Sequence, residues 1–288
     1  MYAIIGITGK VGSAVAENLL KKNLPVKAIL RNHAKAGYWE HKGAKIAIAD
    51  LKDENALTKA FEKTAGVFLM TPPLWDSNDP MREHDQMLHA LTLAIAKTKP
   101  GKVVFLSSVG GHLATGTGAI RKLYDLENTL AELNIPTVGI RAAWFMENYT
   151  GSLGQAEDSG ILSSFLVRTD ERIPMIAIAD IGSLASELLQ ENWTGHRIIE
   201  LEGPARYAPA DVARLLSDAV QKEILTEAIP DKDFESTYLS YGFTMEGSLA
   251  MSEMIRGFNR GTLVFEENGI EHAKGDTTLK QVLNPFLI

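Results

Sequence analysis

The fold is decided by residues 2–12, which read YAIIGITGKVG. An apolar run precedes three glycines, and apolar residues four apart, Val11, Val15 and Leu19, follow them. This order predicts a strand, a tight turn and an amphipathic helix. Glycines let a pyrophosphate approach the backbone, and the free N–H groups at the start of a helix attract its charge. The residues expected to contact a nucleotide are Gly6, Thr8, Gly9, Lys10, Val11 and Gly12.

The glycine spacing alone is a weak signal, because G-x-x-G-x-x-G differs from the G-x-G-x-x-G of dinucleotide-binding dehydrogenases and also fits a plain structural turn. The surrounding pattern favours the nucleotide. Short apolar runs recur along the chain at 26–30, 45–49, 66–70, 102–106 and 137–140. Helical periods separate these runs, which predicts an α/β fold with a doubly wound parallel Rossmann sheet. Such sheets bind ligands at the carboxyl ends of their strands.

The alternation of strand and helix ends after Trp144, and this divides the chain. Residues 1–150 are predicted to form a dinucleotide-binding Rossmann domain, joined by part of 173–203, where two strands and a helix are expected. Residues 204–288 carry mainly helical patterns, the first with a proline in its opening turn. We expect this tail to form a smaller C-terminal substrate lobe.

The composition excludes several classes of protein. The formal net charge of -7 and the lack of a basic cluster argue against nucleic acid as a partner. The absence of cysteine excludes disulfides and thiolate chemistry, and His84 and His89, five apart, suit a solvated helix face better than a metal site. The first strand begins at Tyr2, which leaves no space for a signal peptide, and no apolar run is long enough for a membrane span. We expect a cytoplasmic protein that binds a small molecule.

The residues after the second strand bear on the choice of cofactor. NAD-binding folds usually place an acidic side chain there, on the ribose 2′-hydroxyl. This chain instead has Arg31 and Lys35, with no carboxylate between Glu17 and Glu40. A guanidinium binds phosphate through paired hydrogen bonds, so the pattern favours NADP over NAD. The alternative is a solvated helix N-terminus.

Three later strands end in residues suited to the rest of a dinucleotide. A carboxylate and its neighbour are expected beside the adenine, a stiff loop over the ribose, and two hydroxyls near the nicotinamide. Each has a plain alternative, a helix cap for the first and an ordinary strand end for the others. In that order the residues are Asp50 and Leu51, Thr71 and Pro72, and Ser107 and Ser108.

The acceptor site is expected next to the nicotinamide. Trp144, Phe145 and Asn148 follow the sixth strand and suit an apolar wall with one polar group for a flat ring. The two aromatic side chains also suit an anchor for the lobe. His112, in the glycine-rich loop after the fifth strand, is a candidate proton donor or a surface histidine.

Together these stretches resemble the NmrA-like branch of the atypical short-chain dehydrogenase/reductases. The resemblance is clearest over residues 1–205. It rests on the glycine turn, on Arg31, on Asp50 and Leu51, and on four further segments: 105–108, 127–133, 141–148 and 178–181. The resemblance implies an NADP(H)-binding protein of one of two kinds. One kind is a reductase, such as the bacterial NADPH-dependent quinone reductases, and the other is a regulator that binds the dinucleotide without turnover.

The chain departs from short-chain dehydrogenases at their catalytic pair, a tyrosine acid with a lysine four residues later. Tyr124 is followed at that spacing by Asn128, and Leu123 stands where relatives often carry lysine or histidine. A quinone needs no strong acid, because hydride transfer leaves a delocalised, weakly basic hydroquinone anion. We therefore expect hydride transfer from NADPH to a quinone or similar conjugated carbonyl, with His112 and Tyr124 as candidate catalytic residues.

The missing catalytic pair keeps a second function open. In this alternative, the protein is a redox-sensing regulator that binds NADP and reports it to a protein partner. The pattern leaves both a protein partner and a homo-oligomer open.

Overall fold

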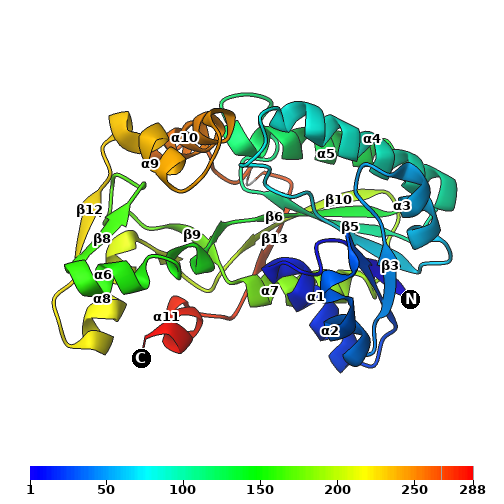
Figure 1. Cartoon of the computed structure of the whole chain (residues 1–288), viewed down its shortest axis with the longest axis horizontal. Coiled ribbons are helices and arrows are strands. Elements are labelled where there is room, and N and C mark those ends of the chain that lie inside the picture. The colour runs from blue at the N-terminus through cyan, green and yellow to red at the C-terminus, as the bar shows by residue number, and fades with distance from the viewer. Residues whose placement is uncertain (267, 288) are drawn as a thin grey trace.

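The computed structural model describes residues 1–266 and 268–287 and is built on one large sheet (Figure 1). Its eight strands all run parallel, in the order β13-β10-β6-β5-β4-β1-β2-β3. The strands are β1 (Tyr2–Ile4), β2 (Val26–Leu30), β3 (Lys45–Ile48), β4 (Gly66–Leu69), β5 (Val103–Ser108), β6 (Thr137–Ala142), β10 (His196–Glu202) and β13 (Glu271–Lys274). The order reverses between β1 and β4, the switch point where such sheets bind ligands. The predicted doubly wound parallel sheet is confirmed.

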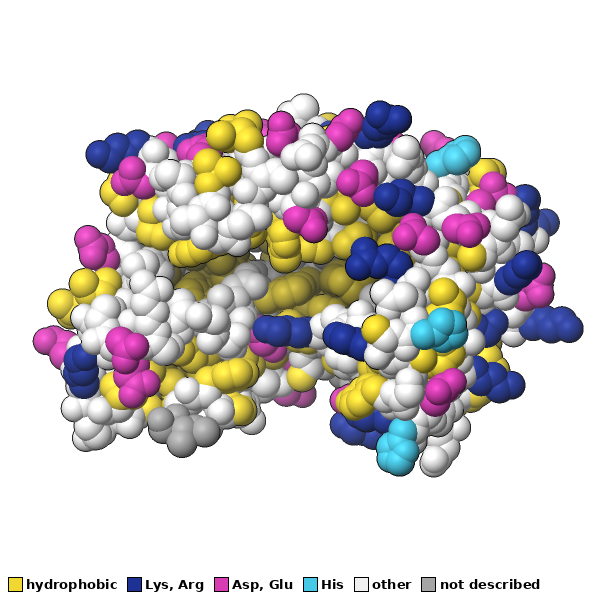
Figure 2. All heavy atoms as spheres, viewed as in Figure 1, with side chains coloured by type: hydrophobic (Ala, Val, Ile, Leu, Met, Phe, Trp, Pro, Cys, Tyr) yellow, Lys and Arg dark blue, Asp and Glu magenta, His cyan; other side chains and the backbone are white. Residues whose placement is uncertain are grey.

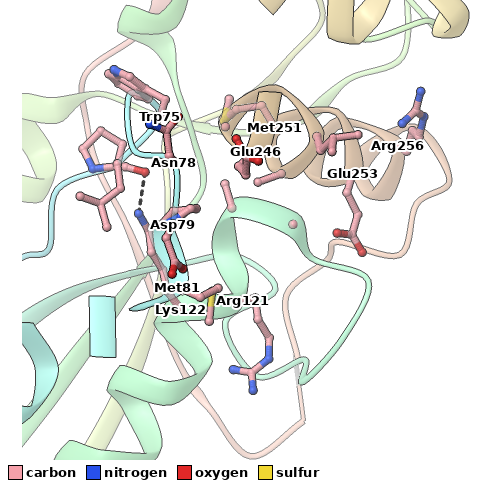
Figure 3. A pocket seen from close by; sticks show the side chains of 18 residues that line it. Trp75, Asn78, Asp79, Met81, Arg121, Lys122, Glu246, Met251, Glu253 and Arg256 are labelled. Carbon is pink, nitrogen blue, oxygen red and sulfur yellow. Dashed lines mark hydrogen bonds between the residues drawn. The ribbon is translucent and has the colours of Figure 1, made fainter. Parts of the chain in front are cut away.

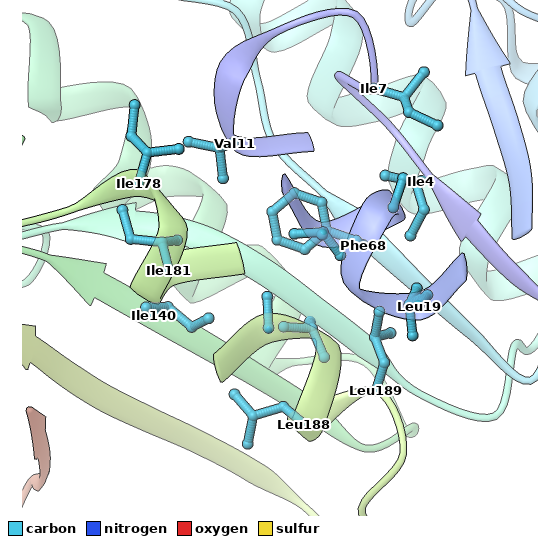
Figure 4. Packing of buried hydrophobic residues seen from close by; sticks show 14 of the residues in the cluster. Ile4, Ile7, Val11, Leu19, Phe68, Ile140, Ile178, Ile181, Leu188 and Leu189 are labelled. Atoms are coloured by element: carbon cyan, nitrogen blue, oxygen red, sulfur yellow. The ribbon is translucent and has the colours of Figure 1, made fainter. Parts of the chain in front are cut away.

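Helices cover both faces of the sheet, as its continuous apolar strands require (Figure 1). On one face lie α1 (Lys10–Lys21), α2 (Ala36–His41) and α7 (Ile178–Leu188), and on the other α3 (Glu54–Phe61), α4 (Pro80–Thr98) and α5 (Arg121–Ala131). Figure 4 shows the first of the two interfaces, where Ile4 and Phe68 of the sheet share a buried cluster with Leu19 and Ile181 of the helices. A second buried cluster fills the opposite face.

A smaller lobe adjoins the end of the sheet. Its strands are β7 (Trp144–Phe145), β8 (Ile161–Ser164), β9 (Ile173–Ile176), β11 (Arg206–Tyr207) and β12 (Leu225–Ala228). The remaining helices are α6 (Leu153–Ser159), α8 (Pro209–Val220), α9 (Phe234–Ser240), α10 (Met245–Asn259) and α11 (Leu279–Leu283). Short 3₁₀ turns are η1 (His33–Lys35), η2 (Gly118–Ile120), η3 (Met146–Tyr149), η4 (Asp231–Asp233) and η5 (Asn284–Phe286). Within the described ranges, no helix combines the length and the hydropathy needed to cross a bilayer.

The strand pairing bears on the domain boundaries. β9 pairs with both β7 and β11, and β8 pairs with β12, so segments from both sides of the predicted boundary lie in one lobe. β13 lies beside β10 as the edge strand of the main sheet, although its sequence, EHAK, has no apolar run. We therefore propose a substrate lobe that combines 144–176 with 204–265, in place of 204–288 alone.

Candidate active site

The turn at residues 6–12 fits only glycine at two positions. Gly6 has a φ of +70°, and the N–H of Gly9 donates to the Gly6 carbonyl at 2.9 Å. A Cβ atom on Gly12 would lie 2.3 Å from the Gly6 oxygen, so the first turn of α1 packs directly on the chain that precedes it. At these two glycines no side chain covers the backbone, at the place where the sequence predicts a phosphate.

The N-terminus of α1 is open to a negatively charged ligand. Its N-cap, Gly9, supplies no side-chain hydrogen bond, and the first turn has no acidic residue. The N–H groups of Lys10, Val11 and Gly12 lack partners inside the helix, and the helix dipole adds positive potential there. Thr8, Gly9 and Lys10 are exposed. Figure 2 shows a deep hollow with an apolar floor and with Lys and Arg side chains at its edge.

Two exposed basic side chains follow β2. Arg31 and Lys35 are exposed, and neither forms an ion pair or hydrogen bond through its side chain with any residue that the structure describes. Between them, Asn32 Oδ1 accepts the N–H of Ala34 at 3.0 Å and fixes the turn η1. A fixed turn that carries two unpaired cations suits a phosphate monoester.

The carboxylate after β3 is not the cap of the next helix. Asp50 Oδ1 accepts the N–H of Lys52 at 2.9 Å, whereas α3 is capped by Asp53, whose Oδ1 accepts from Ala56 at 3.0 Å. Leu51 packs against the buried cluster of that face. Asp50 therefore shapes the turn at the end of β3, which leaves its second oxygen for a ligand.

The loop after β4 is held by Lys122, which the sequence analysis missed. Its Nζ donates to the carbonyl oxygens of Pro72 and Pro73, each at 2.8 Å. Figure 3 shows the second of these hydrogen bonds as a dashed line. Burial lowers the pKa of Lys122 to about 8. Thr71, next to these prolines, is buried, and its hydroxyl has no hydrogen-bond partner among the described residues. Lys122 thus fixes the loop that starts at the switch point.

A pocket of about 660 Å³ lies beyond this loop (Figure 3). Its walls include Trp75, Met81, Leu249 and Met251, and it shares no residue with the predicted dinucleotide contacts. The Trp75 carbonyl accepts the N–H of Thr244 at 3.0 Å, which fastens the loop to the start of α10. The lobe and the loop after β4 therefore hold each other in place.

The two serines at the end of β5 differ in their surroundings. The Ser107 hydroxyl donates to Glu127, which also accepts from Arg141 Nε at 3.0 Å and Nη2 at 2.8 Å. These three residues are buried, with exposed fractions of 2%, 6% and 4%. Ser108 is half-buried and its hydroxyl has no partner among the described residues. Because successive residues of a strand face opposite sides, Ser108 is the hydroxyl left for a cofactor.

The two candidate catalytic residues belong to different segments, the loop after β5 and the helix α5. His112 is half-buried in the loop after β5, and its Nδ1 is buried without a hydrogen-bond partner among the described residues. Tyr124 lies on α5 beside Arg121, whose guanidinium is 5.1 Å from the ring centroid. Tyr124 lies two positions after Lys122, which places the two side chains about 200° apart around the helix. Among the described residues, neither the His112 nor the Tyr124 side chain forms a hydrogen bond to Ser107 or Ser108, so both residues stay predictions. We favour His112 as the acid because it lies in the loop that follows the serines.

The segment after β6 holds the predicted acceptor residues. Trp144 and Phe145 form β7 and are half-buried. Trp144 packs edge to face on Phe258 of α10, with 5.2 Å between the ring centroids. Asn148 is exposed in η3. Glu147, between them, accepts the N–H of Ile178 at 2.9 Å, at the start of α7. The Trp144 contact fits the anchoring role that the sequence left as an alternative.

Four charged residues around this site escaped the sequence analysis as functional groups: Lys122, Glu127, Arg141 and Glu147. Glu127, Arg141 and Glu147 entered only as parts of family-like segments. A signal was present, because Arg141 and Glu147 flank an apolar run that follows a buried strand, where a charge is buried only with a partner. The partners themselves lie far away along the chain and had no signal.

The fold and the glycine turn define a class of protein. A family model described as the NmrA-like family matches residues 2–281. The chain therefore belongs to the NmrA-like family, as its motifs predict.

Particular relatives are reductases. The chain is 26% identical over 283 residues to quinone oxidoreductase 2 of Escherichia coli (strain K12). The aligned region covers 96% of this chain and 95% of the relative. It is 24% identical over 255 residues to the NAD(P)H azoreductase of Xenophilus azovorans, over 88% and 86% of the two chains.

Solved structures show the same fold. The NADPH-dependent quinone oxidoreductase of Escherichia coli, complexed with NADPH, superposes with a TM-score of 0.82 at 24% identity and covers 100% of both chains. The triphenylmethane reductase of Citrobacter sp., complexed with NADP(H), superposes with a TM-score of 0.83 at 16% identity over 99% of both chains.

Proposed function

We propose that the protein is an NADPH-dependent reductase that transfers hydride to a quinone or a similar conjugated carbonyl. The observation that carries the proposal is the pair of anion sites at the end of the sheet. One is the bare N-terminus of α1 behind Gly9, and the other is the unpaired Arg31 and Lys35 after β2. A diphosphate and a 2′-phosphate are the two anionic parts of NADP(H).

The chain's own residues fit the rest of the dinucleotide. Asp50 and Leu51 receive the adenine, and Thr71, with its unpartnered hydroxyl, and Pro72 bound the ribose. Ser108 faces the nicotinamide, while Ser107 is engaged by Glu127. NADPH, when bound, supplies the hydride. The protein then has to hold the ring still and keep water away from it.

Reduction of the acceptor depends more on its position next to the nicotinamide than on a catalytic acid. Trp144 and Phe145 provide apolar surface beside the end of β6, and Asn148 provides an exposed amide. A hydride added to a quinone gives a hydroquinone anion, which takes its proton from water or from the His112 imidazole. The names of the relatives, a quinone oxidoreductase and an azoreductase, fit acceptors of this conjugated, flat kind.

The experiment that tests the proposal measures reduced-nicotinamide absorbance with purified protein, NADPH or NADH, and a panel of quinones with one azo dye. Quinone-dependent oxidation that prefers NADPH is the expected result. Tight binding of NADPH with no consumption by any acceptor contradicts the proposal and favours the regulator that binds NADP without turnover.

A further inference from the structure

Glu147 uses only one of its two carboxylate oxygens. Its Oε1 accepts the N–H of Ile178 at 2.9 Å, at the first residue of α7. Its Oε2 is buried and has no hydrogen-bond partner among the described residues. A buried carboxylate oxygen without a partner costs free energy, because it has lost water and gained nothing. A cap for α7 alone does not explain a glutamate whose second oxygen is buried and idle.

The position of Glu147 connects it to the predicted cofactor site. Ile178, which it caps, shares a buried cluster with Val11 in the first turn of α1, and Figure 4 shows the two side chains next to each other. Further along, Gly182 of α7 lies so close to α1 that a Cβ atom there would sit 2.5 Å from the Ala14 side chain. The N-termini of α1 and α7 therefore lie side by side, and Glu147, at the start of α7, also interacts electrostatically with Lys10, the first residue of α1.

The charged groups around Glu147 indicate which kind of partner its Oε2 can take. Burial raises the pKa of Glu147, the charge of Lys10 opposes that rise, and the charge of Asp180 adds to it. Asp180 is engaged by Thr277, whose N–H and hydroxyl donate to it at 3.0 and 2.6 Å. Phosphate oxygens only accept hydrogen bonds, so they cannot satisfy a carboxylate. The missing partner is therefore a hydrogen-bond donor, an N–H or O–H group.

Two neighbours share this property. Trp144 Nε1 and Tyr149 Oη are also buried without hydrogen-bond partners among the described residues, and both belong to the segment of Glu147. Three polar groups within six residues after β6 thus lack partners, and Glu147 is the one whose partner, Ile178, packs beside the first turn of α1. In a sheet of this topology, the adenosine lies toward β2 and β3, where Arg31 stands, and the reactive half lies toward β5 and β6.

We propose that Glu147 Oε2 accepts a hydrogen bond from the nicotinamide half of the bound dinucleotide, from either the carboxamide N–H or a ribose hydroxyl. Glu147 is then a positioning residue that orients the ring relative to the acceptor, while Oε1 keeps its bond to Ile178. This inference rests on the proposed function. It adds a specific contact that the glycine turn and Arg31 do not provide.

The test is isothermal titration calorimetry of NADP+ and of its 3-acetylpyridine analogue, which lacks the amide N–H. Glu147→Gln is nearly isosteric, so its oxygen keeps the bond to Ile178 while an NH2 group replaces Oε2. That NH2 group then faces the carboxamide N–H donor against donor, or, if the partner is a ribose hydroxyl, a neutral amide replaces the charged acceptor. In either case we expect the Kd for NADP+ to rise at least about tenfold with an unchanged melting temperature. The matched control is Glu227→Gln, at an exposed glutamate on β12.

The analogue identifies the donor. If Glu147→Gln weakens NADP+ but not the acetylpyridine analogue, the carboxamide is the donor, and an equal loss for both points to the ribose hydroxyl. A wild-type Kd for NADP+ in a folded Glu147→Gln protein overturns the inference, because a purely structural cap is retained in that variant. Failure of the wild-type protein to bind NADP+ overturns the proposed function instead.

A second variant covers the case in which Glu147→Gln does not fold. Glu147→Asp keeps the negative charge at the two helix N-termini but is one methylene shorter, so one carboxylate group no longer reaches both partners. We expect the same loss of NADP+ affinity in this variant, and an undiminished affinity contradicts the proposed contact.

Discussion

Arg141 holds the carboxylate of Glu127 with two nitrogen atoms, Nε at 3.0 Å from Oε1 and Nη2 at 2.8 Å from Oε2. Its Nη1 also donates to Glu266 at 2.7 Å and lies 3.5 Å from Glu200. Ser107 donates to the same Glu127 carboxylate. The guanidinium thus links β6 to α5, β10 and the segment that leads to β13, and Glu127 extends this network to Ser107 at the end of β5.

Removing this guanidinium should be strongly destabilising. In Arg141→Met, Glu127 and Glu200 lose their shared cation while they stay buried, and breaking a buried ion pair in this way costs about 3–5 kcal/mol. Urea unfolding followed by circular dichroism measures the difference. The control is Arg214→Met, which removes an exposed arginine paired with Asp211 at 2.7 Å and should cost less than about 1 kcal/mol. Equal losses in the two variants contradict a structural role for the buried network.

The glycine turn predicts that a side chain at Gly12 is excluded by lack of space for a Cβ atom. In Gly12→Ala, the new methyl group would lie 2.3 Å from the Gly6 oxygen, so α1 has to move away from the turn. Overpacking of this kind costs about 1–3 kcal/mol, and we expect NADPH binding to be lost with it. Gly37→Ala is the control, since a Cβ there meets nothing within 4 Å, and it should be neutral or stabilising by about 0.4–1 kcal/mol. Calorimetric NADPH binding by Gly12→Ala at wild-type affinity would count against this account of the turn.

Arg31 should set the preference for NADPH over NADH. Arg31→Asp removes a charge-assisted hydrogen bond to the 2′-phosphate, worth about 1.5–3 kcal/mol, or roughly 10- to 100-fold in Kd for NADPH. The Kd for NADH should change little, because NADH has no phosphate at that position. Arg260→Asp, at an exposed residue after α10, is a control for the change in net charge. Equal loss of both cofactors, by fluorescence titration, excludes Arg31 as the discriminating residue.

His84 is buried on α4, so the expectation of a solvated helix face was wrong for this residue, and its burial should make stability depend on pH. Burial, and then the charge of Lys122, lowers its pKa from 6.5 to about 4, so the imidazole is neutral in the folded protein. As the pH falls from 6.5 to 4, the unfolded chain binds a proton that the folded chain does not, and folding loses stability. The difference corresponds to up to about 3 kcal/mol.

The variant that tests this is His84→Leu. Both imidazole nitrogens lack partners among the described residues, so the substitution should cost little at pH 7. Its free energy of unfolding should fall by about 2–3 kcal/mol less than that of the wild type between pH 6.5 and 4. His89→Leu, at an exposed histidine on the same helix, should retain the wild-type pH dependence. Parallel pH profiles for the wild type and His84→Leu contradict the neutral buried imidazole.

The main sheet was predictable because its strands are covered on both faces. A strand buried twice is apolar throughout, so runs such as Val67 to Leu69 mark it, and the helical period between runs marks the crossovers. The turn at Gly6 to Gly12 was predictable because it is local. β13 was not, since its residues are mostly exposed, and a polar edge strand has no apolar pattern to detect.

The site was predictable only where it depends on neighbours in sequence. The glycine turn and Arg31 each follow a strand directly, so their positions follow from the fold. The contacts of Lys122 with Pro72 and of Arg141 with Glu127 join residues 50 and 14 positions apart, and no spacing rule encodes them. For the same reason, the sequence did not show that the Ser107 hydroxyl donates to Glu127, which lies on α5.

The central claim is that this chain holds NADPH at the end of the sheet and passes its hydride to a flat conjugated carbonyl. The most direct measurement is an anaerobic single turnover, in which the preformed complex of protein and NADPH is mixed with menadione and nicotinamide absorbance is followed in a stopped-flow instrument. We predict rapid oxidation of the bound NADPH at a rate that saturates with menadione and is much slower with NADH. A stable complex whose NADPH is not oxidised faster than free NADPH contradicts the account.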